Sequence, residues 1–302
     1  GTGALEFLKS IIYQYFELQE IEVESTNILT QEVEIINEEL QDSFNMNYNA
    51  KLKSHRTEAR ALKFKTPRYS ENWMGVITGT AYVDDLKKVT KKYDCTITEL
   101  LGSLIMYAAS RSQSLFENKD KPFTLFVPVN LRRFFPSRTL RNFSLYVRSA
   151  INFSENLSFE EILNVVKKDM QEELQKEKLQ TRFTATVRTE RNFVMRIAPI
   201  ALKEIALKIG YNLLGDAVNS FSFSNIGVVN LSDEMKKHID RIVFTVGASP
   251  KTPINLGAIS FNNKITMTFS SFLLDRSIQR EFFRFLANEG VKIVIESNEL
   301  EV

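Results

Sequence analysis

The residue types that most often carry out nucleophilic or acid–base chemistry are scarce in this chain. It contains one cysteine, Cys95, and two histidines, His55 and His238. Cys95 follows Asp94, whose negative charge raises the pKa of a neighbouring thiol, so we interpret it as an unreactive cysteine at the entrance of a helix. Neither histidine stands in a pattern typical of a catalytic triad. A structural zinc site needs about four closely spaced Cys or His ligands, so no metal site is predicted.

Arginines are concentrated in the segment VPVNLRRFFPSRTLRNFSLYV, where five of them lie between positions 132 and 148. A predicted strand leads to Asn130 and Arg132, and an irregular connection returns through Asn142 into the next strand. Guanidinium groups bind phosphate and carboxylate in a bidentate manner, so this segment is compatible with an anion clamp. The alternative is one structural ion pair beside a solvated loop, and the spacing alone favours that alternative.

A second candidate site lies in the segment FSFSNIGVVNL. Ser222, Ser224 and Asn225 add hydroxyl and amide groups to a phenylalanine-rich strand, and Gly227 permits a close approach of the backbone. Such groups at the wall of an apolar cavity can donate hydrogen bonds to a carbonyl or an oxyanion. The alternative is a half-buried strand whose polar face lies in water, and the alternation of residue types favours it.

Helices that would position these groups are indicated by apolar spacing and by end signals. Residues 5–19 have the spacing of an amphipathic helix whose apolar face needs a partner. Thr96 with Glu99, and Ser158 with Glu161, form capping boxes. The first precedes the almost wholly apolar text LLGSLIMYAA, which predicts a buried helix, and the second opens a charged helix to about residue 178. A short helix from Asp84 and one over residues 193–209 are also predicted. A final helix is predicted with Asp275 as its cap and Gly290 as its stop.

Strands are predicted over residues 76–82, 123–131, 145–153, 220–229, 241–248, 254–261 and 264–272. Asn262-Asn263 lies where a tight hairpin would join the last two. Helices and strands alternate early and strands then follow one another, so the sequence predicts an α/β fold with a mixed sheet.

Composition excludes several classes of protein. Lys and Arg number 39 against 37 Asp and Glu, a net charge of +2 that predicts neither nucleic acid nor a membrane surface as a partner. No apolar run approaches the roughly 20 residues of a membrane span. A single cysteine provides no disulfide framework, and the first residues, GTGALEFLKS, lack the pattern of a signal peptide. These features predict a cytoplasmic protein.

Charge is unevenly distributed near the beginning of the chain. Residues 1–50 carry ten acidic residues and one lysine, whereas residues 51–68 carry seven Lys or Arg and one Glu. The acidic stretch could recognise a basic partner, but such runs are usually solvated surfaces, which is the interpretation we favour.

Four segments occur in an order that is shared with known enzymes: GTGALEFL, DDLKKVTKKYDCTITELLGSLIMYA, VPVNLRRFFPSRTLRNF and FSFSNIG. Together they resemble the chloramphenicol-acetyltransferase-like superfamily, specifically its bacterial alcohol-acetyltransferase-like branch, which is related to peptide-synthetase condensation domains. The first segment resembles the text that follows the Asp of the HHxxxDG (or HxxxDG) signature, with Gly1 at the motif's glycine. The resemblance covers essentially all 302 residues as the later part of a family chain.

The resemblance implies a CAT-like mixed sheet flanked by helices. Residues 1–70 would be the remnant of an N-terminal subdomain and residues 71–302 the C-terminal subdomain. The family arginine that pairs with the motif Asp falls at Arg132, a structural role, and the family asparagine falls at Asn142. Arg141 stands where the family often has glycine. Ser222, Ser224 and Asn225 would line the substrate or oxyanion channel.

The resemblance also implies a reaction. A motif histidine acts as general base on an alcohol or amine, which attacks the thioester carbonyl of acyl-CoA or another carrier, with no covalently bound cofactor. HxxxD does not occur in residues 1–302. The chain alone is therefore expected to contribute no catalytic residue and to be inactive without an N-terminal subdomain. Arg132 is then expected to find another anion or solvent. Alternatives are a non-catalytic binding or scaffold protein of the same fold and a peptide-synthetase condensation domain.

Overall fold

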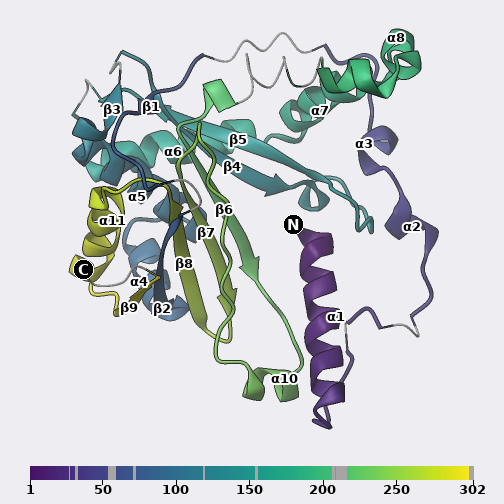
Figure 1. Ribbon diagram of the computed structural model, residues 1–302, viewed down its shortest axis with the longest axis horizontal. Helices are drawn as coiled ribbons and strands as arrows, with labels where there is room; N and C mark the ends of the chain where they lie inside the picture. The colour runs from purple at the N-terminus through teal and green to yellow at the C-terminus, as the bar shows by residue number, and fades with distance from the viewer. Residues whose placement is uncertain are drawn as a thin grey trace.

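A mixed sheet of seven strands forms the centre of the protein, in the order β5-β4-β6-β7-β8-β2-β9 (Figure 1). Strand β6 is parallel to β4 and to β7, and the other pairs are antiparallel. The computed structural model describes residues 1–26, 28–30, 33–53, 59–70, 73–117, 120–153, 156–205, 208 and 216–298. The predicted fold class, a mixed sheet flanked by helices, is confirmed.

Most strands lie where the alternation of residue types predicts them. The strands are β1 (Lys63–Phe64), β2 (Gly75–Tyr82), β3 (Phe116–Glu117), β4 (Phe123–Asn130), β5 (Ser144–Ile151), β6 (Phe221–Val228), β7 (Ile254–Phe261), β8 (Lys264–Ser271) and β9 (Ile293–Ser297). Asn262 and Asn263 adopt φ values of 47° and 59° between β7 and β8, as a two-residue hairpin turn of this type requires. Strands β1 and β3 form a separate two-stranded pair.

Helices flank the sheet, and both predicted capping boxes are present. The helices are α1 (Thr2–Leu18), α2 (Asn37–Leu40), α3 (Ser43–Met46), α4 (Val83–Lys92), α5 (Ile97–Arg111), α6 (Phe159–Glu173), α7 (Lys176–Arg191), α8 (Phe193–Ile197), α10 (Asp233–His238) and α11 (Ser277–Asn288). The prediction that Asp275 caps the last helix is wrong by one residue, because the N-cap of α11 is Arg276 and carries no side-chain cap hydrogen bond. Asp275 precedes that cap and accepts a hydrogen bond from the Ser277 N–H at 2.8 Å. Among the described helices, none combines the length and apolar character that a membrane crossing requires.

One face of the sheet holds the main core. The apolar helix α5 is buried there, as predicted, and packs beside α6 and α11. Four buried phenylalanines from β6, β8 and α11 belong to the same core: Phe221, Phe223, Phe269 and Phe282. Gly102 of α5 allows the helix to lie against Leu125 of β4.

Helix α1 packs on the opposite face of the sheet. Phe16 of α1 joins a buried apolar cluster with Met235 of α10 and with Ile259 and Phe261 of β7. This contact provides the partner that the apolar spacing of residues 5–19 demands. Acidic residues at the end of α1 and just beyond it, including Glu17, are exposed, consistent with a solvated stretch. The division at residue 70 remains a prediction.

The strand predicted over residues 241–248 is wrong. This segment instead passes over the face of β7 and β8, running alongside β8, and it is held there by hydrogen bonds from side chains of the sheet. Thr266 Oγ1 donates to the Ile242 carbonyl at 2.8 Å and Asn255 Nδ2 donates to the Gly247 carbonyl at 2.7 Å. A Cβ atom on Gly257 would clash with the backbone oxygen of Phe244, so the glycine makes this close crossing possible.

The charged helix predicted to run to about residue 178 is also wrong in its extent, because it ends at Glu173 and α7 begins at Lys176. Met170 of α6 and Leu179 of α7 are both buried. On one continuous helix these two side chains would lie about 180° apart, so a break is needed for both to reach the core. In the region predicted as a helix over 193–209, α8 covers only Phe193–Ile197 and residues 200–205 are helical; positions 206–207 and 209–210 lie outside the described residues.

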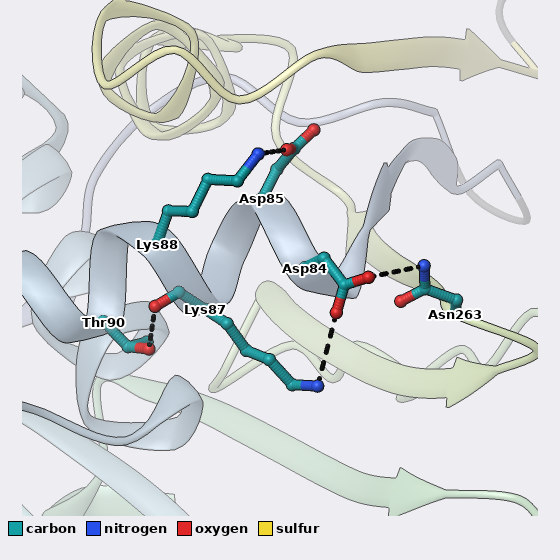
Figure 2. A network of polar contacts seen from close by, with 6 residues as sticks. All are labelled: Asp84, Asp85, Lys87, Lys88, Thr90 and Asn263. Atoms are coloured by element: carbon teal, nitrogen blue, oxygen red, sulfur yellow. Dashed lines mark hydrogen bonds and ion pairs between the residues drawn. The ribbon is translucent and has the colours of Figure 1, made fainter.

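Polar contacts join the start of α4 to the β7–β8 hairpin, as Figure 2 shows. Asp84 Oδ2 accepts a hydrogen bond from Asn263 Nδ2 at 2.9 Å, and Asp84 Oδ1 accepts one from Lys87 Nζ at 3.3 Å. These hydrogen bonds, chiefly that from Asn263, lower the pKa of Asp84. The Val83 N–H also donates to the Asn263 carbonyl at 2.8 Å. The same asparagine therefore forms the hairpin turn and anchors the helix.

Candidate active site

The sheet is split between its parallel strands β4 and β6. Both strands are eight residues long, yet they pair only at Leu125 with Phe221 and at Phe126 with Ser222. Beyond these pairs the strands separate, and the edge of β6 that faces β4 has no strand partner in the described part of the chain. We call the opening between residues 127–130 and 223–228 the strand split.

The beginning of α1 lies beside the end of β4. Asn130 Nδ2 is 3.4 Å from Thr2 Oγ1, and Arg132 Nη1 is 3.5 Å from the same oxygen. Gly3 brings the helix against the backbone of the following connection, because a Cβ atom there would clash with the Leu140 carbonyl oxygen. Ile226 of β6 packs against the same apolar cluster as α1. The first turn of α1 therefore adjoins the strand split.

Arg132 is held by neutral acceptors. Its Nη2 donates to the carbonyls of Thr139 at 2.6 Å and Arg141 at 2.8 Å, its Nε donates to Thr139 at 3.1 Å, and its Nη1 donates to Asn130 Oδ1 at 3.2 Å. Burial lowers the pKa of the guanidinium. No carboxylate of the described residues pairs with it, so the expected anion is replaced by backbone carbonyls.

Asn142 lines a cavity of about 610 Å³ between strands β4 and β5 and helices α3 and α7. Its Oδ1 accepts a hydrogen bond from Ser144 Oγ at 2.7 Å. The cavity is also lined by Phe126 and Tyr146, whose rings stack with centroids 4.3 Å apart. Arg132 and Asn142 thus lie at the two ends of the connection between β4 and β5. Arg132 contacts the beginning of α1, whereas Asn142 lines this cavity.

The three predicted residues of β6 do not share a face. Ser222 and Ser224 lie on the side of residues 241–248, since their register partners Asn255 and Gly257 contact that segment. Asn225 lies on the side of α5, because side chains alternate along a strand. The structure therefore separates the hydroxyls from the amide.

Asn225 fixes the local shape of β6. Its Nδ2 donates to Thr98 Oγ1 of α5 at 3.1 Å, and its Oδ1 accepts from the Gly227 N–H at 3.0 Å. Gly227 has φ of 88°, a left-handed conformation that glycine adopts without strain, and the register of β6 against β7 shifts between Asn225 and Val228. One Nδ2 hydrogen remains for another acceptor.

Sequence reasoning missed two side chains that organise this region, Thr98 and Asn255. Thr98 stands inside the capping-box text, where no signal distinguishes it. Asn255 is 2% exposed within the apolar run INLGAISF, and a buried amide must find partners, which is a signal in itself. It accepts from the Ser222 N–H at 3.0 Å and donates to the Gly247 carbonyl.

His238, the histidine that the structure describes, does not reach the strand split. His238 ends α10 and its ring lies 5.5 Å from that of Phe16, near the end of α1. Phe16 is about 21 Å along the helix from Thr2, given the rise of an α-helix. His55 lies outside the described residues. No cluster of potential metal ligands occurs in the ranges that the structure describes.

Cys95 is expected to react slowly with alkylating reagents. Burial, and then the charge of Glu99, raise the pKa of its thiol to about 11. At pH 7.5 its thiolate fraction should be about 300-fold below that of a free cysteine with a pKa of about 8.5, and the rate should rise about tenfold per pH unit up to about pH 10. Mass-spectrometric measurement of iodoacetamide modification checks this, with N-acetylcysteine as control. A rate that levels off below pH 9 would contradict it.

Comparison with known proteins identifies the family. The model of the alcohol acetyltransferase family matches residues 7–289. A search of curated protein sequences finds no match.

Solved structures share the fold at low sequence identity. The epimerization domain of tyrocidine synthetase B is 10% identical with a TM-score of 0.54, covering 94% of this chain and 66% of that one. The trichothecene 15-O-acetyltransferase TRI3 of Fusarium sporotrichioides is 12% identical with a TM-score of 0.52, covering 96% and 62%. This chain thus spans about two thirds or less of the length of these structures. Because the family model extends over nearly all of its residues, the chain belongs to the alcohol acetyltransferase family.

Proposed function

We propose that the chain forms part of an acyltransferase that moves an acyl group from acyl-CoA, or another carrier thioester, to an alcohol or amine. The observation that carries the proposal is the meeting of the first turn of α1 with Arg132 at the end of β4, beside the strand split. By the resemblance of the first residues, the family signature would end where α1 begins, and its catalytic loop would then enter this opening. Membership of the family supports the same reaction.

The chemistry requires a base, a carbonyl and hydrogen-bond donors. The base removes the proton of the acceptor hydroxyl or amine, whose oxygen or nitrogen attacks the thioester carbonyl. The oxyanion that forms collapses, the carbon–sulfur bond breaks, and the thiol of the carrier leaves with a proton. The unpaired edge of β6 and the remaining Nδ2 hydrogen of Asn225 are the candidate donors to the oxyanion.

The proposal assigns the base to a histidine outside residues 1–302, contributed by an N-terminal subdomain that packs against α1. In support, no histidine of the described residues lies at the strand split, and residues such as Phe7 and Leu18 of α1 are 68% and 80% exposed. Residues 1–302 alone would then be inactive. The single cysteine supports a cytoplasmic setting.

Thiol release tests this function. The natural longer chain that contains residues 1–302 is incubated with acetyl-CoA and a panel of alcohols and amines, and the free thiol is measured with a chromogenic disulfide. We expect acceptor-dependent release from the longer chain and none above background from residues 1–302. Absence of acceptor-dependent release with acetyl-, hexanoyl- and palmitoyl-CoA would reject the proposal, and release by residues 1–302 alone would reject the assignment of the base.

A further inference from the structure

A groove of about 570 Å³ lies between α11 and the edge strand β9, at the end of the sheet remote from β4 and β5. It combines an apolar floor with an arginine rim. The floor is formed by Ile77, Phe283, Ala287, Ile293 and Ile295. Figure 1 shows α11 and β9 beside each other near the C-terminus.

The floor of the groove is an apolar strip that α11 leaves uncovered. Gly79 of β2 faces α11, because a Cβ atom there would clash with the Phe283 ring, and Gly79 is the register partner of Ile295. Ile295 and Ile293 therefore point to the α11 side of the sheet. Ile295 nevertheless remains 53% exposed.

Among the described strands β9 is the last of the sheet, so its outer edge has no strand partner there. The Asn298 N–H donates to the Val76 carbonyl of β2 at 3.1 Å. In an antiparallel strand the N–H groups point alternately to the two sides, so those of Glu296 and Val294 also point to β2, and those of Ile293 and Ile295 point away from it. An added strand could accept these hydrogen bonds.

The rim is positively charged. Arg280 and Arg284 of α11 and Arg276, the residue just before the helix, are spaced four residues apart, and all three line the groove. Arg280 Nε and Arg284 Nη1 lie 4.0 Å and 3.1 Å from Glu281 Oε1, and the two arginine side chains remain 64% and 58% exposed. Glu281 itself does not line the groove, and the acidic residue that does, Asp275, accepts a hydrogen bond from the Ser277 N–H at 2.8 Å.

A buried amide adds a polar group at the same place. Gln279 lines the groove and is 3% exposed, and its Oε1 has no hydrogen-bond partner within the described residues. A buried acceptor without a donor is unfavourable. A ligand that carries N–H groups would offer one.

We propose that this groove binds an extended acidic segment of another protein, which pairs with the edge of β9 and places carboxylates against Arg280 and Arg284. The backbone carbonyls of the bound segment would accept hydrogen bonds from the outward N–H groups of β9. Every second side chain of that segment would be apolar and would pack on the apolar strip beside Ile295. A second copy of this chain fits less well, because antiparallel pairing of two β9 strands would bring two arginine rows together. The proposal is independent of acyl transfer.

Fluorescence anisotropy with a labelled peptide, acetyl-Val-Glu-Val-Glu-Val-Glu-Val-amide, tests the proposal. We expect saturable binding below millimolar concentration. The double change Arg280→Glu and Arg284→Glu should raise Kd by about tenfold or more, since two ion pairs become repulsions. The matched control, Arg111→Glu with Arg138→Glu, reverses two exposed charges elsewhere and should leave Kd within about twofold.

Two further peptides separate strand addition from charge attraction. A peptide with Lys in place of Glu should not bind. The acidic peptide is also made with N-methyl groups on either the odd or the even amides, and one of these two versions should bind at least about tenfold more weakly than the unmethylated peptide. Unchanged binding of both methylated versions, equal binding of the lysine peptide, or no binding of the acidic peptide at 1 mM would overturn the proposal. Equal loss in both double variants would show nonspecific charge attraction and would overturn it as well.

Discussion

Replacing Phe269 with alanine is expected to lower the free energy of unfolding by about 3–5 kcal/mol, the cost of truncating a fully buried aromatic side chain. Phe269 is 0% exposed at the centre of β8. Its ring meets those of Phe221, Phe282 and Phe283 edge to face, with centroids 6.3, 5.1 and 5.7 Å away. Removing the ring leaves a cavity between β6, β8 and α11, which these rings cannot collapse to fill.

Urea unfolding followed by far-ultraviolet circular dichroism measures this loss. Phe7→Ala on α1 is the matched control, because it removes the same atoms from a side chain that is 68% exposed. The control should change the free energy of unfolding by less than about 0.5 kcal/mol. A Phe269→Ala cost below about 1.5 kcal/mol would show that this ring does not lie in the core.

Replacing Gly257 with alanine is expected to lower the free energy of unfolding by about 1–3 kcal/mol, the usual cost of forcing an extra methyl group into a packed site. The new Cβ would meet the backbone oxygen of Phe244, so the segment 241–248 would have to move off the sheet. Gly257 does not need a left-handed backbone, because it is not among the glycines with positive φ. The cost is therefore steric.

Gly247→Ala is the matched control for this change, in the segment that crosses over Gly257. No atom lies within 4 Å of the position its Cβ would take, and its φ is not positive. Restriction of the unfolded chain should make this substitution neutral or stabilising by up to about 1 kcal/mol. Limited proteolysis should cut residues 241–248 faster in Gly257→Ala only. Equal stability and equal cleavage of both variants would contradict the crossing.

Local signals predict much of this fold. The capping boxes at Thr96 and Ser158 and the Asn262-Asn263 turn are read from residues within a few positions of each other, and all three are confirmed. The short strand β9 was missed, because five residues at the sheet edge, mostly exposed, carry little apolar alternation. Residues 241–248 alternate as a strand does, yet their partner is a sheet face rather than a neighbouring strand.

The candidate site was likewise only partly predictable from the sequence. The resemblance assigns to Arg132 the family arginine that pairs with the motif Asp, and this structural role remains a prediction. In the structure Arg132 lies next to Thr2 of α1. The resemblance also assigns Ser222, Ser224 and Asn225 to one channel. In the structure Asn225 donates a hydrogen bond to Thr98 on the α5 side of the sheet, whereas the two serines lie on the opposite side. Which face a strand residue occupies depends on the bulge and on packing, and the sequence of β6 alone does not determine either.

The sequence by itself determined the types of most elements, the ends of several helices and the family to which the chain belongs, because these depend on neighbouring residues and on motif order. The tertiary structure decided where β4 and β6 separate, which groups face the split, and that carbonyls rather than a carboxylate hold Arg132. It also decided that residues 241–248 cross the sheet. Each of these depends on contacts between residues distant in sequence, where burial and steric fit outweigh local preference.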